Sequence, residues 1–225
     1  MHLAPSDELR AINKPETMIK LPEPRHDSET SIESALRRRQ SVREFSREAL
    51  TLAEVSQLLW AAQGTTDPEG RRTAPSAGAL YPLEVFLVSG KQGGLAAGVY
   101  RYRPREHDLV CVAEGDWRAK LATAALEQDR LANAPVTIVI TAVYERTARK
   151  YKQRAERYVH MEVGHAVENV HLQAVALDLG TVVVGAFDDA EVKRVLSLPA
   201  NEQPLCLMPV RKPTHSDSAS NVLCR

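Results

Sequence analysis

The chain has 225 residues, of which 44% are hydrophobic and 26% are charged, and this length suffices for one well-buried domain. Lys plus Arg and Asp plus Glu both number 29, so the zero net charge argues against general binding to nucleic acid or to an anionic membrane. The three cysteines form no Cys-x-x-Cys pair, which fits a reduced, cytoplasmic setting rather than a zinc ribbon or a disulfide framework. The N-terminus has no signal-peptide pattern, and no apolar run approaches transmembrane length.

Residues 1–26 are polar and contain four prolines, a composition that predicts a flexible arm with little structure of its own. One domain is expected over residues 27–213. Residues 214–225 are polar and are expected to be disordered.

The first informative segment follows a helix that Ser31 can cap and that is expected over Ile32–Gln40. Arg39, Ser41 and Arg43 alternate along the extended segment after it and would share one face. Two guanidinium groups and a hydroxyl can hold a phosphate or a flavin carbonyl. A solvated basic face is the alternative interpretation.

The second informative segment is the loop Thr73–Pro82, which lies before a predicted buried strand over Leu83–Val88. A helix with a Thr51–Glu54 capping box precedes it and is expected to end near Gln63. Within the loop, Gly78 permits a turn or a close backbone approach to a ligand, and Ser76 offers a hydroxyl. Free amides around Gly78 would suit an anion or a flat polar ring. An ordinary strand-entry loop is the alternative interpretation.

Pro75-Ser76-Ala77-Gly78-Ala79-Leu80-Tyr81-Pro82, followed by Leu83-Glu84-Val85, resembles the signature of the SagB/ThcOx-type dehydrogenases. These form a branch of the FMN-dependent nitroreductase family. The resemblance implies an α+β fold with a central, mostly antiparallel sheet flanked by helices. It also implies an intertwined homodimer with an FMN at each of two sites across the interface.

The resemblance also assigns roles to the two segments. Arg39 and Ser41 would hold the FMN phosphate, Arg43 would face the pyrimidine end of the ring, and Gln40 stands where the family often has a second arginine. The residues that would flank the flavin are Pro75, Ser76, Gly78, Ala79 and Leu80.

The middle of the chain predicts a hairpin, a helix, a strand and a second, strongly charged helix. The hairpin joins Val99–Arg103 to His107–Val112, Asp116 can cap a helix over Trp117–Leu131, and Pro135–Val143 is rich in β-branched residues. The charged segment that follows would ordinarily be a solvated helix face. By resemblance to azoline-oxidising members of the branch, its residues Lys150 and Tyr151 would take a proton from the substrate.

The segment Tyr158–Leu179 predicts a buried helix, and it resembles the long central helix that builds the family's dimer interface. Glu162, His165 and Asn169 recur at spacings of three and four, so they share one face. A metal site needs more ligands than this set provides, and a polar cluster within the helix packing is the favoured interpretation.

Near the C-terminus, Val184-Gly185-Ala186 precedes a helix that Asp188 can cap. By resemblance, the amide at the Gly185–Ala186 step lies beside flavin N5. The segment Glu202–Val210 resembles the family's closing strand. Arg211 and Lys212 stand where a glycine is usual, and they would either add phosphate contacts or disturb the turn.

These features together indicate an FMN-dependent oxidoreductase that transfers hydride between the flavin and a small organic substrate. Two substrate classes remain open: a nitroaromatic or quinone reduced at the expense of NAD(P)H, and a peptide thiazoline or oxazoline oxidised to the azole. The sequence has no Gly-x-Gly-x-x-Gly pattern, so NAD(P)H is expected to bind transiently. A flavin-binding, non-catalytic partner in a biosynthetic complex is the alternative.

Overall fold

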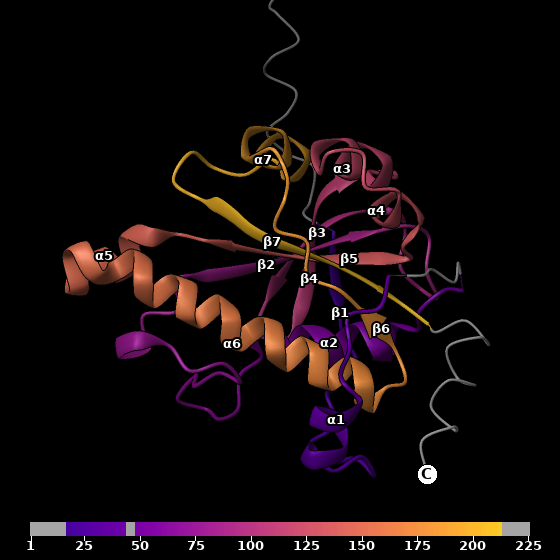
Figure 1. Cartoon of the computed structure of the whole chain (residues 1–225), viewed down its shortest axis with the longest axis horizontal. Coiled ribbons are helices and arrows are strands. Elements are labelled where there is room, and N and C mark those ends of the chain that lie inside the picture. Colours follow the sequence, from indigo (N-terminus) through magenta and orange to yellow (C-terminus); the bar gives the residue numbers. More distant parts are fainter. Residues whose placement is uncertain (1–16, 44–47, 213–225) are drawn as a thin grey trace, which may run out of the picture.

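A seven-stranded antiparallel sheet forms the centre of the molecule, with the strand order β1-β4-β3-β2-β5-β7-β6 (Figure 1). The computed structural model describes residues 17–43 and 48–212. The strands are β1 Met18–Lys20, β2 Leu83–Ser89, β3 Gly98–Arg103, β4 Asp108–Glu114, β5 Val136–Ala142, β6 Gly180–Thr181 and β7 Gln203–Arg211. Every residue of the central strand β5 is buried, as its run of β-branched side chains requires.

Helices cover both faces of the sheet. They are α1 Ile32–Arg38, α2 Leu52–Gln63, α3 Arg118–Ala124, α4 Asp129–Asn133, α5 Tyr144–Tyr151, α6 Ala155–Ala176 and α7 Asp189–Leu196, with short 3-10 turns η2 Ala77–Ala79 and η3 Lys152–Arg154. Side chains alternate along each strand. In β2, Val85 and Leu87 therefore pack in a core cluster with α2 and α6, while Phe86 packs in a second cluster with α3, α4 and α7.

Three helix starts predicted from capping residues are confirmed. The Ser31 hydroxyl accepts a hydrogen bond from the Ser34 amide at the start of α1, and Thr51 and Glu54 form the complete capping box of α2. The Asp188 carboxylate accepts from the Glu191 amide at 3.0 Å and caps α7. Each of these signals depends on neighbouring residues alone, which is why the sequence reveals them.

The helix predicted over Trp117–Leu131 is wrong, because two short helices, α3 and α4, occupy this segment. Leu126 and Glu127 between them have φ angles of 57° and 58°, which a right-handed helix excludes. Asp116 accepts a hydrogen bond from the Arg118 amide, but Trp117 is the capping residue of α3.

Part of the segment predicted as an N-terminal arm belongs to the sheet. Met18–Lys20 forms the edge strand β1, paired with β4, and the Leu21 side chain is buried in the core. Residues 1–16 and the predicted disordered tail lie outside the described residues. In residues 17–43 and 48–212, no helix combines the length and the apolar character that crossing a bilayer requires.

The predicted α+β class, with an antiparallel sheet flanked by helices, is confirmed. Helix α6 crosses one face of the sheet, with α5 at one of its ends and β6 at the other (Figure 1). This arrangement determines where the predicted site residues lie.

Candidate functional site

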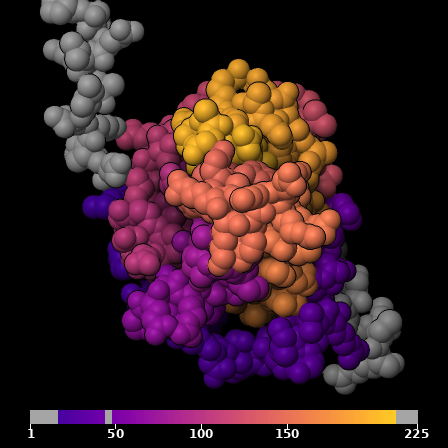
Figure 2. Space-filling model, turned by 90° about the vertical axis from the view of Figure 1, so that its left-hand side faces the viewer, coloured from indigo at the N-terminus to yellow at the C-terminus, as the bar shows by residue number. Residues whose placement is uncertain are grey.

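Gly78 brings the loop before β2 into contact with the residues predicted to move a proton. A Cβ atom placed on Gly78 would lie 3.0 Å from the Lys150 Nζ and 3.0 Å from the Tyr151 hydroxyl. Only a residue without a side chain leaves both groups in place at this distance. Figure 2 shows this end of the molecule, where the surface of α5 borders that of the loop. Two segments more than 70 positions apart in the chain therefore converge here.

The loop reaches this position through an unusual backbone. Gly78, Ala79 and Tyr81 all have positive φ angles, of 65°, 53° and 45°. Glycine adopts this region freely, whereas alanine and tyrosine do so only when the surroundings hold them there. The Ser76 hydroxyl accepts a hydrogen bond from the Tyr81 amide at 2.9 Å, and the Ser76 carbonyl accepts one from the Ala79 amide at 3.0 Å.

The proton-transfer candidates lie at the end of α5. Lys150 is exposed, and Tyr151 is half-buried against the ring of Tyr158 on α6, with the two ring centroids 4.8 Å apart and nearly perpendicular. Helix α5 stops directly after them, because Lys152 has a φ of 50°. The tyrosine ring is therefore held by packing, while the lysine amine remains open to an approaching molecule.

A buried carboxyl group lies behind this loop. Glu162 on α6 is only 2% exposed, and its Oε1 atom has no hydrogen-bond partner in the described part of the chain. Burial raises the pKa of Glu162 to about 7, while a hydrogen bond from Ser76 and the charge of Arg72 oppose the increase. At neutral pH this carboxyl therefore exists in both protonation states.

The predicted cluster of Glu162, His165 and Asn169 does not form. His165 is exposed, and the Asn169 amide donates instead to the Thr73 carbonyl at 3.2 Å. Helical spacing puts the three residues on one broad side of α6, but only Glu162 is buried. Among the described residues, no group of three or more His, Cys, Asp or Glu side chains is arranged to hold a metal ion.

A second group of predicted residues gathers at the other end of α6. Ser41 forms a parallel bridge with Thr181, and the Val42 amide donates to the Thr181 carbonyl at 2.9 Å. A Cβ atom on Gly180 would lie 2.9 Å from the Val42 Cβ, so this glycine permits the close approach. Arg39 is half-buried here, whereas Gln40, Ser41 and Arg43 are exposed.

The same chain continues into the segment predicted to face the flavin. Val184 is buried and pairs with Leu207 through both backbone groups, which fixes the start of the segment. Gly185 and Ala186 are exposed, and neither amide N–H has a backbone acceptor in the parts of the chain that the structure describes. A Cβ atom on Gly185 would meet no atom within 4 Å. Both amides therefore lack a backbone acceptor, and open space borders Gly185.

The structure separates the two basic residues at the end of β7. Arg211 is fully buried, and its Nη1 donates to the Lys212 carbonyl at 3.1 Å, so its guanidinium does not offer the expected phosphate contact. Pairing of Arg211 with Gly180 in the sheet places it inside the edge instead. The Lys212 Nζ lies 2.7 Å from a Glu48 carboxylate oxygen, and this hydrogen bond raises the pKa of the lysine.

Helix α6 lies between two groups of predicted residues. At 1.5 Å per residue its 22 residues span about 33 Å, with Tyr151 shortly before its first turn and Gly180 shortly after its last. No hydrogen bond or ion pair in the described residues joins the segment 75–80 to the segments 39–43 and 184–186. Within the described part of one chain these segments therefore make no direct polar contact with each other.

Comparison with known proteins decides the family. Residues 36–210 match the family described as the nitroreductase family. The chain belongs to the nitroreductase family. It is 48% identical over 182 residues to MJ1384 of Methanocaldococcus jannaschii, which carries the name nitroreductase, and the match covers 81% of this chain and 91% of that protein. The predicted resemblance is thereby confirmed.

Two further similarities extend this result. The chain is 31% identical over 155 residues to the microcin B17-processing protein McbC of Escherichia coli, covering 66% of this chain but only 57% of McbC. Its fold matches a crystal structure from Ralstonia eutropha that carries the name nitroreductase, with a TM-score of 0.77 and 30% identity over 88% of this chain and 90% of that one. The nitroreductase-like fold is therefore shown.

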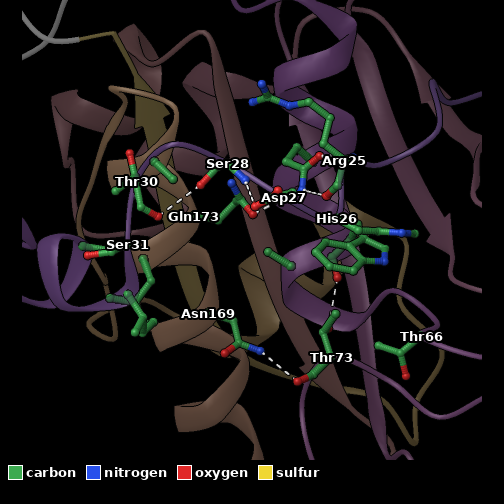
Figure 3. A pocket seen from close by; sticks show the side chains of 17 residues that line it. Arg25, His26, Asp27, Ser28, Thr30, Ser31, Thr66, Thr73, Asn169 and Gln173 are labelled. Atoms are coloured by element: carbon green, nitrogen blue, oxygen red, sulfur yellow. Dashed lines mark hydrogen bonds between the residues drawn. The ribbon is translucent and has the colours of Figure 1, made fainter.

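A pocket of about 660 Å³ opens between α1, α2 and α6, away from both groups of predicted residues. Figure 3 shows its walls, which include Gln173 and the hydrogen-bonded pair Asn169 and Thr73. No residue that the sequence predicts for the nitroreductase site lines this pocket. The pocket touches the site only through Thr73, the first residue of the loop.

Sequence reasoning missed two arginines that contact the loop, Arg72 and Arg146. The guanidinium of Arg72 lies over the Tyr81 ring at 4.6 Å from its centroid, and Arg146 donates to the Tyr81 carbonyl at 2.9 Å. The position of Arg72 directly before the loop was a weak indication in the sequence that it contacts the loop. Nothing in the sequence indicated such a contact for Arg146, because a charged residue on a charged helix predicts only a solvated face.

Proposed function

We propose that this nitroreductase-family chain is an FMN-dependent oxidoreductase that transfers hydride between the flavin and a small organic substrate. One observation carries the proposal: the loop of the flavin-facing signature lies against Lys150 and Tyr151 at Gly78. A signature for cofactor binding and a pair suited to proton transfer thus share one surface. Family membership and the name of MJ1384 support the same class of reaction.

FMN, when bound, supplies the acceptor or donor of a hydride. The residues of this chain then have to move the accompanying proton. The exposed Lys150 amine and the packed Tyr151 hydroxyl are the groups within reach of a substrate beside Gly78, and either can accept or return a proton. The Tyr158 ring holds Tyr151 in one orientation, so that its hydroxyl needs little reordering.

The residues at the other end of α6 suit the cofactor itself. Arg39 and Ser41 would hold the phosphate with Gln40 beside them, and Arg43 would face the pyrimidine end of the ring. The half-buried Lys212 amine, which pairs with Glu48, would add a charge. The free amides of the Gly185–Ala186 step would donate to a ring atom that gains negative charge. Open space at Gly185 leaves room for a flat ring to approach the backbone. The set fits a flavin mononucleotide.

A homodimer would bring the two groups of residues together. A two-fold axis that pairs α6 with its copy in antiparallel orientation places the start of one helix beside the end of the other. The Gly78 loop of one subunit would then face the Gly185 segment of its partner. Exposed apolar side chains on α1 and α6, those of Ile32, Leu36 and Met161, suit such a contact.

Two substrate classes fit this site in the cytoplasm. A nitroaromatic or quinone would be reduced by hydride that NAD(P)H first delivers, in a ping-pong sequence. A peptide thiazoline or oxazoline would instead lose a hydride and a proton, and the similarity to McbC, a protein named for processing microcin B17, supports this class. We place the small-molecule reductase first, because the chain matches MJ1384 over 91% of that protein.

Anaerobic single-turnover kinetics test the proposal. The protein is loaded with FMN, reduced by NADH or NADPH, and mixed with 1,4-benzoquinone or with a model thiazoline, while the flavin absorbance is followed. Lys150→Ala and Tyr151→Phe should each slow the step that moves the proton by about 10²-fold or more. A wild-type protein that binds FMN and exchanges electrons with none of these reagents would instead support a non-catalytic, flavin-binding partner.

A further inference from the structure

Three interactions converge on Tyr81, the next-to-last residue of the loop Thr73–Pro82. Its amide donates to the Ser76 hydroxyl at 2.9 Å, and its carbonyl accepts from the Arg146 Nη1 at 2.9 Å. The guanidinium of Arg72 lies over its ring. Pro82 follows Tyr81 directly and restricts the backbone of the residue before it. Tyr81 nevertheless has a φ of 45°, so these contacts have to hold a disfavoured conformation.

Arg146 connects this point to the rest of the molecule. Its Nη2 lies 2.5 Å from the Glu84 carboxylate in β2, and the other oxygen of Glu84 lies 3.0 Å from Arg101 in β3. The guanidinium thus uses one nitrogen for the loop and another for the sheet. Both contacts are partly shielded from water, which strengthens a charge-assisted hydrogen bond.

Arg146 also lies on α5, four positions before Lys150 and therefore one turn away on the same side of the helix. A single side chain consequently ties three parts together: the helix that carries the proton-transfer pair, the strained end of the loop, and the central sheet. If the guanidinium of Arg146 is removed, the Tyr81 carbonyl and the Glu84 carboxylate both lose their hydrogen bond to α5.

We propose that Arg146 is a positioning residue, which holds Tyr81 in its left-handed conformation and so fixes Gly78 against Lys150 and Tyr151. The inference rests on the proposed function, because the distance that it controls is the one across which the proton moves. Arg146 does not touch the reacting atoms in this arrangement. Misplacement by about 1 Å is enough to slow a positioned reaction by about 10²-fold.

The chain offers a matched control for this residue. Arg149 lies three positions further along α5, is exposed, and makes no hydrogen bond or ion pair with any residue that the structure describes. Arg146→Met and Arg149→Met remove the same charge from the same helix. Arg146→Lys keeps the charge and one donor, but it cannot reach two acceptors in the way that a guanidinium does.

Two measurements are made on the FMN-loaded protein: kcat and KM with NADH and 1,4-benzoquinone, and hydrogen-exchange protection of the amides in residues 76–82. R146M should lower kcat by about 10- to 100-fold with KM changed less than about threefold. It should also lower protection of the Tyr81 amide by at least about tenfold, because that amide is held within the loop. R149M should change neither kcat nor the protection of the Tyr81 amide, and R146K should give values of both between those of R146M and wild type.

Equal kcat and equal Tyr81 protection in R146M and R149M would overturn the proposal, as would a fall in kcat without any loss of protection. If R146M does not fold, R146K carries the test, and equality between R146K and R149M overturns it. Failure of the proposed function is seen separately, as a wild-type protein that binds no FMN and shows no turnover. The exchange comparison between R146M and R149M still tests the contact with Tyr81 in that protein.

Discussion

Replacing Glu162 by glutamine should change how the stability of the folded chain depends on pH. The folded pKa of this carboxyl is about 7, against 4.5 in an unfolded chain. Between these values the folded chain binds a proton that the unfolded chain has already released. The contribution of Glu162 to the free energy of unfolding therefore falls as pH rises through this window, and it levels off above pH 7.

The size of the effect follows from the same two values. At 1.36 kcal/mol per pKa unit, the difference corresponds to about 3 kcal/mol. The amide side chain of the E162Q variant has no proton to lose, so the stability of this variant relative to wild type should rise by about 3 kcal/mol between pH 4.5 and pH 8. Because Glu162 is almost completely buried, solvent screening reduces this figure little.

Urea unfolding of both proteins at several pH values, at one protein concentration and without added FMN, measures the difference. Glu156→Gln is the matched control, because it makes the same substitution on the exposed side of the same helix. A difference between E162Q and wild type that does not change with pH, or that falls as pH rises, would refute the reasoning. A difference that falls as pH rises would mean that the charge of Arg72 stabilises the ionised form of Glu162 more than burial favours its protonated form.

Three further substitutions test other parts of the structure. Gly78→Ala should lower kcat more than tenfold, because the added methyl group displaces Lys150 and Tyr151. The control is Gly94→Ala, which is also at a positive φ but in open space and should leave kcat unchanged. Equal effects of the two substitutions on kcat would contradict the proposed role of the contact at Gly78. Gly180→Ala should weaken FMN binding about tenfold by displacing Val42, and an unchanged Kd in a fluorescence titration would place the phosphate elsewhere. Burial lowers the pKa of His107, so the contribution of His107 to stability should decrease as pH falls below about 6.5, and the stability of His107→Gln relative to wild type should rise over the same range in urea unfolding.

The features that the sequence predicted well depend on neighbouring residues. Ser31 and Asp188 predict helix starts because the side chain of each accepts a hydrogen bond from the amide three residues later in the chain. The loop Thr73–Pro82 was recognisable as a turn because its proline, glycine and serine residues restrict or free the backbone locally. The buried strand β5 was recognisable from its run of β-branched residues.

The features that escaped prediction depend on contacts between distant parts of the chain. Strand β1 exists because Met18 pairs with Val110, and its polar, proline-rich surroundings gave no sign of this. Arg211 looked like a phosphate ligand, but pairing with Gly180 buries it in the sheet edge. The convergence of Arg72 and Arg146 on Tyr81 likewise needs the fold, since no spacing in the sequence relates these three residues.

The central claim is that this member of the nitroreductase family carries a flavin mononucleotide. The visible absorption spectrum of the freshly purified protein, with any released chromophore identified by mass, tests it most directly. A yellow protein that releases FMN at about one per chain is the predicted result. A colourless protein that also fails to take up added FMN would contradict the account, whatever its similarity to members of the nitroreductase family.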